Sequence, residues 1–433
     1  MQKLDFDPYD FQIKEIEGIK VYYKDLPLAP CTHIRWSISN GASNDDIGKE
    51  GTAHFLEHVL FDGNPMLPKK TDVDVFSRKY LLDSINAYTS FYNTVLLCNF
   101  LPKNTNTALD AIYNIVYKPL IRDEDIEHER KVITQETWAR LINPTYTEYL
   151  KNWSDNLYQD VPSQKRMDSP CGWIDTISAI NKDDLVKAHR SYVKENTHVV
   201  LVGNITDELF TKVAEIIKLI PNGDKLEETE ISKKISPAIE RRWIKSYSEI
   251  GMSESKQTTL NIIRLLEKNS TDHGTLDLMT DFTYYLMMKK LRQENSWCYS
   301  ISAQFSDRPD YIYQSIDVKV APENAKDAEE IIWQTIGDII NGKYKEDFEA
   351  TKQTSIDSLL ARERVSEQIA TNAEHYLMID KKIASLAEII NDLEKVKYDD
   401  IVKHFSLHFK KEDVFTELIV PNEEVAGAEE KTD

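Results

Sequence analysis

The chain has 433 residues, 41% hydrophobic and 29% charged, a composition that is typical of folded domains and excludes extensive disorder. Its 53 Lys and Arg against 73 Asp and Glu give a net charge of −20, which argues against nucleic acid or an anionic membrane as a partner. No apolar run is long enough for a membrane-spanning helix. The four cysteines form no close pair and the N-terminus lacks a secretory signal, so we expect a cytoplasmic protein.

Alternating strands and helices are predicted for the first half of the chain. Period-two alternation of apolar residues predicts strands over 13–23 and 32–39, and residues 85–100 are predicted to form two strands. The continuous apolar run at 198–202 predicts a buried strand. Helical spacing predicts helices over 52–61, 104–117 and 123–141. In the last of these, Ile126, Val132, Ile133 and Trp138 are expected to face inward.

A polar, proline-containing stretch over 221–241 divides the chain almost in half and is the predicted linker. It separates a domain over 1–220 from a domain over 242–421, and an acidic tail over 422–433 follows. The second half again mixes the two kinds of element. Its predicted strands cover 258–263, 297–305 and 311–320, and its predicted helices cover 275–294, 325–341, 345–362, 365–378 and 394–405.

The first candidate site lies on the predicted helix over 52–61. His54 and His58 are four residues apart and therefore share one helix face, where two imidazoles can hold a zinc ion. Glu57 projects near the same edge, and a carboxylate there is the general base that hydrolysis of a peptide requires. This H-x-x-E-H order is the inverted zincin motif. The alternative is an amphipathic helix with surface histidines.

A catalytic zinc site needs a third protein ligand, which the helix over 123–141 can supply. Glu129 and Glu136 are two turns apart and face the same way. One can bind the metal while the other orients a histidine by accepting its free N–H. His128 is a rival ligand that points about a quarter turn away. The alternative is a solvated acidic helix face.

Taken together, four separated segments resemble the insulinase/pitrilysin family of inverted zinc metallopeptidases. The likeness is strongest to the processing-peptidase-like branch, whose chains are similar in size to this 50.1-kDa chain. It extends from about residue 10 to 420, with a departure at Asp62, where the family usually has a basic residue. The matching segments are 51–58 for the zinc helix, 84–89 with Thr94 for the active-site edge strand, 129–136 for the third-ligand helix, and 291–299 for an Arg-x6-Tyr pair.

For the metal site, the resemblance implies one Zn²⁺ per chain, bound by His54, His58 and Glu136. It implies that Glu57 is the general base that takes a proton from the attacking water. Glu129 is implied to be an acid behind the ligands rather than a ligand itself.

For the substrate, the resemblance implies two further pairs of residues. Asn86 and Ala87 would present edge-strand backbone to an extended peptide, so that main-chain hydrogen bonds supply the affinity. Arg292 and Tyr299 would steady the substrate carbonyl and the tetrahedral oxyanion.

The implied fold is α+β, with two similar domains that each hold a mostly antiparallel sheet flanked by helices and together form half of a clamshell chamber. The implied activity is that of a zinc metalloendopeptidase cleaving short unfolded peptides inside a closed chamber. A homodimer, or pairing with a related chain, would complete the chamber, and Arg292 and Tyr299 could then act in trans. The alternatives are a processing-peptidase-like subunit that needs a related partner, a non-catalytic peptide-binding homologue, and a metal-binding helical scaffold without hydrolysis.

Overall fold

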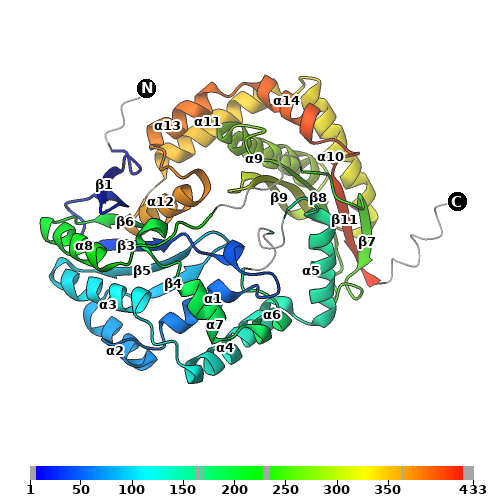
Figure 1. Cartoon of the computed structure of the whole chain (residues 1–433). Helices are drawn as coiled ribbons and strands as arrows, with labels where there is room; N and C mark the ends of the chain where they lie inside the picture. The colour runs from blue at the N-terminus through cyan, green and yellow to red at the C-terminus, as the bar shows by residue number, and fades with distance from the viewer. Residues whose placement is uncertain (1–5, 162–165, 167–169, 228–234, 363, 423–433) are drawn as a thin grey trace.

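Two β-sheets and the helices that cover them make up the chain in a computed structural model, which describes residues 6–161, 166, 170–227, 235–362 and 364–422 (Figure 1). The first sheet has the order β1-β2-β6-β3-β5-β4, and the second has the order β7-β11-β8-β10-β9. Each sheet contains one parallel pair, β2–β6 or β7–β11, and its other pairs are antiparallel. The predicted α+β class with mostly antiparallel sheets is therefore confirmed.

The strands and helices of the first half follow the predicted order. The strands are β1 Gln12–Ile16, β2 Ile19–Asp25, β3 Thr32–Ile38, β4 Asn86–Thr89, β5 Thr94–Phe100 and β6 Thr197–Gly203. The helices are α1 Thr52–Leu60, α2 Lys70–Tyr80, α3 Thr105–Tyr117, α4 Asp123–Leu141, α5 Pro144–Leu157, α6 Ile174–Ala179, α7 Lys182–His189 and α8 Asp207–Leu219.

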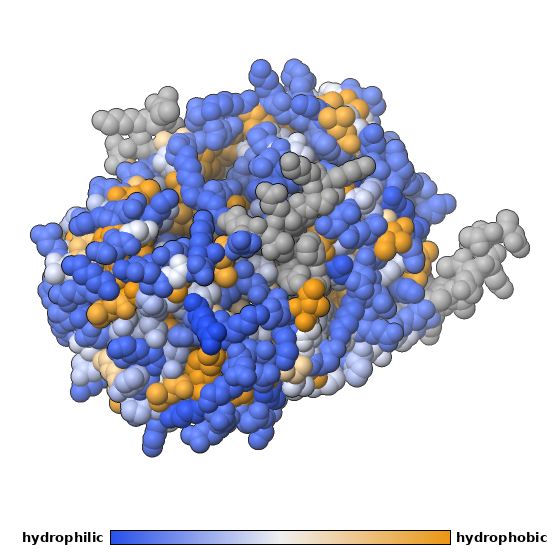
Figure 2. Space-filling model, viewed as in Figure 1, coloured by the Kyte–Doolittle hydropathy of each residue, from blue (hydrophilic) through white to orange (hydrophobic). Residues whose placement is uncertain are grey.

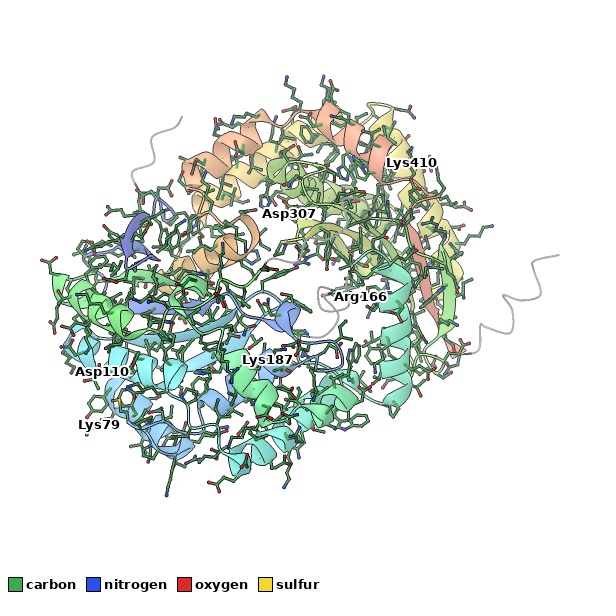
Figure 3. The ribbon with its side chains drawn as sticks, in the orientation of Figure 1. Lys79, Asp110, Arg166, Lys187, Asp307 and Lys410 are labelled. Atoms are coloured by element: carbon green, nitrogen blue, oxygen red, sulfur yellow. The ribbon has the colours of Figure 1, made fainter. Side chains whose placement is uncertain are left out.

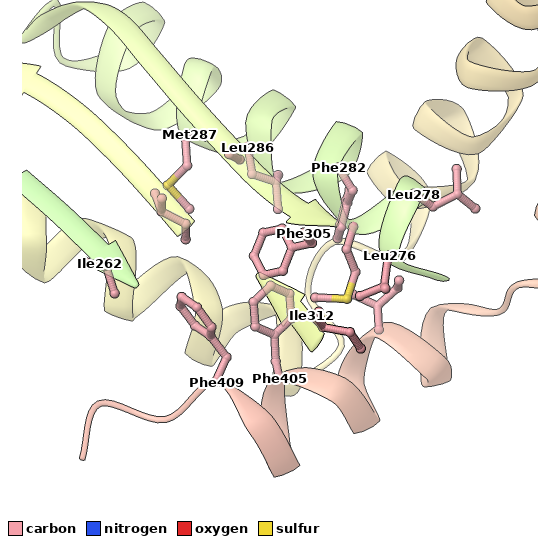
Figure 4. Close-up of a cluster of buried hydrophobic side chains, with 14 of the residues drawn as sticks. Ile262, Leu276, Leu278, Phe282, Leu286, Met287, Phe305, Ile312, Phe405 and Phe409 are labelled. Atoms are coloured by element: carbon pink, nitrogen blue, oxygen red, sulfur yellow. The ribbon is translucent and has the colours of Figure 1, made fainter. Parts of the chain in front are cut away.

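The second half repeats the pattern of a sheet with helices. Its strands are β7 Arg242–Ser246, β8 Thr258–Glu267, β9 Cys298–Asp307, β10 Tyr311–Val320 and β11 Phe415–Val420. Its helices are α9 His273–Met287 with a π-helical continuation Met288–Glu294, α10 Ala325–Ile340, α11 Lys345–Ala361, α12 Ser366–Asp380, α13 Leu386–Lys395 and α14 Tyr398–His408. Aromatic rings of α9, β9 and α14, among them Phe282, Phe305 and Phe405, meet in its core (Figure 4).

Each half covers part of the other half's sheet. Helix α12, from the second half, packs on β3 and β6 of the first sheet. At the end of α5, Leu157 and Tyr158 pack against Ile263 and Tyr311 of the second sheet. Charged side chains lie on the outside of the molecule, as Lys79, Asp110 and Lys410 illustrate (Figure 3). Hydrophilic residues dominate the face shown in Figure 2. None of the described helices combines the length and apolar composition that crossing a bilayer requires.

Three details of the predicted elements are wrong or only partly right. Val132 and Trp138 of α4 are 37% and 40% exposed rather than inward-facing, whereas Ile126 and Ile133 are buried. The predicted helix over 394–405 is two helices, because α13 ends at Lys395 and α14 begins at Tyr398. No predicted range covers the strands β7 and β11 or the helices α2, α5, α6, α7 and α8, and only the end of α13 was predicted.

The predicted domain division stays a prediction. Within 221–241, residues 228–234 lie outside the described residues, but Ile235 and Ala238 are buried against the second sheet. That end of the predicted linker therefore contributes to a core. Nearly all of the predicted tail, 423–433, also lies outside the described residues.

Candidate active site

Helix α1 is held at its first turn by a buried carboxylate and a glycine. Asp45 accepts hydrogen bonds from the backbone N–H groups of Gly51 (2.7 Å) and Ala53 (2.9 Å), which have no partner inside the helix. Gly51 has φ +99°, and a Cβ there would lie 2.6 Å from the carbonyl oxygen of Cys171. Only glycine fits this position, and its backbone brings the segment at Cys171 against the start of α1.

Two imidazoles and a carboxylate meet where α1 packs against α4. Glu136 Oε2 lies 3.8 Å from His54 Nε2 and 3.5 Å from His58 Nε2. The three ligand atoms all lie within 4.8 Å of one another. His128, the rival ligand, is exposed and does not belong to this group. The fold thus brings together the two histidines and the glutamate that the sequence pointed to.

These residues fit a zinc ion in both chemistry and spacing. Two imidazoles and one carboxylate form a donor set that zinc uses in catalytic sites, with an open fourth position. Ligands at about 2.1 Å from a tetrahedral ion stand about 3.4 Å apart, close to the separations seen here. Burial lowers the pKa of His54 to about 3, with the neighbouring His58 adding to the effect, so His54 is neutral and its lone pair is free to bind a metal.

Glu129 stands behind the cluster rather than in it. Its Oε2 lies 2.9 Å from His58 Nδ1, the nitrogen that points away from Glu136, and its Oε1 accepts a 2.6 Å hydrogen bond from Lys70 Nζ. Burial raises the pKa of Glu129, but the hydrogen bonds from His58 and Lys70 outweigh this and hold it well below its usual value. An ionised Glu129 fixes the ring of His58 with Nε2 toward the cluster. Asp62, at the point of departure from the family, lies 3.8 Å from Lys70 Nζ.

Glu57 is placed to handle a proton next to the cluster. Its side chain is on the edge of α1 beside His54 and His58, and the residue is only 9% exposed. Thr89 Oγ1 donates a 3.1 Å hydrogen bond to one carboxylate oxygen of Glu57. Burial raises the pKa of Glu57 above its usual value, which makes the carboxylate a better proton acceptor near neutral pH.

The pocket around these residues has a volume of about 640 Å³, and the edge strand β4 forms one of its walls. Asn86 and Ala87 both line this pocket, as expected for residues that meet a substrate. The backbone N–H of Ala87 is 2.9 Å from Asn86 Oδ1, so a peptide that pairs with it must displace the amide side chain. The outer edge of β4 offers backbone groups to an added strand.

Arg292 and Tyr299 face each other, but they do not line this pocket. The Arg292 guanidinium carbon lies 5.0 Å from the centre of the Tyr299 ring. Tyr299, on the edge strand β9, is 80% exposed. The proposed action of the pair in cis or in trans stays a prediction.

Sequence reasoning missed several side chains at the pocket, among them Lys70, Arg140 and Cys171. Arg140 Nη1 lies 2.6 Å from Cys171 Sγ, which lies 3.7 Å from His54 Nε2. Burial raises the pKa of Cys171 to about 11, so its thiol is neutral at pH 7. These residues come from three separate segments. The only local signal was the spacing of Arg140, one turn after Glu136.

The fold places two imidazoles and the Glu136 carboxylate at metal-ligand spacing, with the buried carboxylate of Glu57 beside them. Such a site defines a candidate metallopeptidase. Residues 20–165 match the family described as Insulinase (Peptidase family M16), and residues 179–355 match Peptidase M16 inactive domain. The chain belongs to the insulinase family, peptidase family M16. The second match runs from the end of the first half into the second half, where the sequence shows no zinc helix.

Curated relatives with similar sequences are named as zinc proteases or processing-peptidase subunits. An uncharacterized zinc protease of Rickettsia bellii is 30% identical over 58% of this chain and 58% of its own length. The zinc protease YmfH of Bacillus subtilis is 25% identical over 81% of this chain and 80% of its own. The mitochondrial-processing peptidase subunit beta of Bos taurus is 30% identical over 39% and 33%. The chain spans little more than half the length of the two Rickettsia relatives, 58% and 52%.

Solved structures share the fold over nearly the whole chain. The first half of the periplasmic protease PqqL from Escherichia coli has a TM-score of 0.80 at 16% identity and covers 96% of this chain and 93% of that one. A putative M16-like peptidase from Alicyclobacillus acidocaldarius has a TM-score of 0.76 at 16% identity and covers 97% and 100%. The chain therefore has the fold of one M16 peptidase half.

Proposed function

We propose that this chain is a zinc-dependent endopeptidase. One observation carries the proposal: His54, His58 and Glu136 meet at metal-ligand spacing beside the buried carboxylate of Glu57. The membership in family M16 and the zinc-protease names of the relatives support it. The zinc would be held by His54, His58 and Glu136, one ion per chain.

The side chains divide the work of peptide hydrolysis. Held by His54, His58 and Glu136, a zinc ion would supply polarisation of the peptide carbonyl and a lower pKa for the attacking water. Glu57 takes the proton of the attacking water and passes it to the leaving nitrogen. Thr89 orients the Glu57 carboxylate through its hydrogen bond, and Glu129 holds the His58 ring in place.

Substrates of this enzyme would be short, unfolded peptides. An extended peptide adds a strand to the free edge of β4 at Asn86 and Ala87, which places its backbone along the pocket. A second M16 half, from another copy or a related chain, would close the chamber over it. Such a partner would also give Arg292 and Tyr299, which lie outside the pocket of their own chain, a site to act on in trans. We propose the cytoplasm as the location.

A processing-peptidase-like subunit that works only with a related partner is the second candidate. The exposed position of Tyr299 and the similarity to processing-peptidase beta subunits favour it. Size measurement of the purified protein with and without candidate partner chains separates the two. Full peptidase activity in a homodimer excludes the second candidate.

Removal and return of zinc tests the proposed activity. A chelator that strips the purified protein should abolish cleavage of a quenched fluorescent peptide library, because the cluster then lacks the ion that polarises the carbonyl. One equivalent of Zn²⁺ per chain should restore cleavage. A zinc-loaded protein that binds peptides without cutting them would show a non-catalytic homologue, and cleavage that persists without metal would contradict the proposal.

A further inference from the structure

Arg140 places a positive charge at one end of the active-site pocket. It lies on α4 one turn beyond Glu136, so the two side chains leave the same face of the helix. Its guanidinium contacts Cys171 Sγ at 2.6 Å, and the sulfur in turn lies 3.7 Å from His54 Nε2. The guanidinium is therefore one side chain away from an atom proposed to bind zinc.

The guanidinium of Arg140 is not ion-paired in the described part of the chain, although Glu57 and Glu136 line the same pocket. No described carboxylate forms an ion pair with it, although the chain has a net charge of −20. Its described hydrogen-bond acceptor is the Cys171 sulfur, which is a weak acceptor. The planar fork of N–H donors on a guanidinium matches the two oxygens of a carboxylate. An exposed guanidinium with unused donors beside a reacting centre is suited to bind an anionic group of the substrate.

The other end of the pocket has a different character. Phe61 follows directly after α1, at the His58 end of the helix, and lines the pocket together with Val73 and Ile85. Arg140 and Cys171 flank the His54 end, one turn away along the axis of α1. Lys70 and Asp74 also line that end, but the Lys70 ammonium is paired with Glu129 at 2.6 Å. A peptide that lies along this pocket therefore meets apolar side chains and a paired lysine on one side of the ligand cluster. On the other side it meets a guanidinium that forms no ion pair with a described residue.

We propose that Arg140 forms a subsite for a substrate carboxylate, either an Asp or Glu side chain or the C-terminus of the peptide. The apolar wall of Phe61, Val73 and Ile85 takes an apolar side chain on the opposite side of the bond to be cut. This inference rests on the proposed peptidase function and adds a substrate preference to it. It predicts that an acidic residue or a free C-terminus near the scissile bond strengthens substrate binding, although the net negative charge of the chain repels acidic peptides.

Binding to the Glu57→Gln variant tests the subsite without turnover. Labelled peptides that share an apolar anchor and carry Asp, Asn or Lys at one varied position are titrated by fluorescence anisotropy, each with a free or an amidated C-terminus. We expect the best Asp peptide to bind about tenfold tighter than its Asn counterpart, as for a charge-assisted pair covered on binding. Selectivity at an internal position identifies a side chain as the ligand, and selectivity for the free terminus identifies the C-terminus.

A charge reversal shows whether Arg140 causes the preference. Arg140→Glu, added to Glu57→Gln, should invert the order so that the Lys peptide binds best, whereas Arg140→Lys should keep the acidic preference in weaker form. Lys131→Glu makes the same change at an exposed site of α4 outside the pocket and should leave the order unchanged. Zinc content equal to that of the parent shows that each variant keeps the site intact.

Two results overturn the inference. One is an absence of acidic preference, or a preference that survives Arg140→Glu. The other is a uniform fall in kcat for all peptides in the otherwise wild-type Arg140→Glu enzyme, with KM unchanged, because Arg140 would then act on the reacting carbonyl. If the wild type cuts no peptide while binding keeps its Arg140-dependent preference, the peptidase proposal fails and the carboxylate subsite stands.

Discussion

Glu57→Gln should keep its zinc and lower the cleavage rate of peptides by about 10²–10⁴-fold, the contribution of a general base. The amide has nearly the same shape as the carboxylate but cannot accept the proton of the attacking water. Glu57 is buried and is not part of the group formed by His54, His58 and Glu136, so its neutralisation leaves the proposed metal ligands unchanged. Cleavage of a quenched peptide and zinc content are measured on the same preparations.

Glu124→Gln is the matched control, because it makes the same chemical change at an exposed site of α4. It should leave both the zinc content and the rate at wild-type values. Rates near those of the wild type in Glu57→Gln would mean that another group takes the proton. Loss of zinc in that variant would instead assign Glu57 to the metal site.

Glu374→Ala should destabilise the chain by about 3–5 kcal/mol, because it removes one member of a buried charged network. Glu374 lies on α12 and is 1% exposed. Its Oε1 accepts hydrogen bonds from Ser37 (2.8 Å) and Asn93 (2.8 Å), and its Oε2 lies 3.0 Å from His198 Nε2. All three partners belong to the first half of the chain. The substitution removes the acceptor of these three buried or half-buried side chains and weakens the packing of α12 on the first sheet.

Denaturant unfolding measures this loss, with Gln368→Ala, at an exposed position of the same helix, as the control. Burial raises the pKa of Glu374, but the charge and hydrogen bond of His198 outweigh it and lower the pKa below the usual value. The wild-type advantage is therefore present at neutral pH and declines as the pH falls toward the folded-state pKa. A loss below about 1 kcal/mol, the size of an ordinary single hydrogen bond, would contradict this account of the contact between the halves.

Local spacing was enough to predict the part of the site that lies on single helices. The four-residue interval of His54 and His58 and the seven-residue interval of Glu129 and Glu136 hold in any α-helix, and α1 and α4 form as expected. The distinct positions of Glu129, behind His58, and Glu136, beside it, depend on how α4 packs against α1. The family resemblance, rather than the spacing, separated their roles.

Contacts between distant segments could not be predicted. The period-two pattern over 32–39 places Ile34, Trp36 and Ile38 on one face and so implies that one face of the strand is buried. In β3 both faces are buried, because α12 covers the other. Nothing in the local pattern of His33-Ile34-Arg35 shows that a helix more than 300 residues away will supply partners for its polar side chains. The contact between Arg140 and Cys171 could not be predicted for the same reason, because the two residues lie on separate segments.

Diffraction from crystals of the zinc-loaded protein, recorded on both sides of the zinc absorption edge, tests the central claim most directly. The account predicts one anomalous peak per chain, within about 2.2 Å of His54 Nε2, His58 Nε2 and a carboxylate oxygen of Glu136. A peak at another place, or one at the histidines with the Glu136 carboxylate turned away, would contradict it.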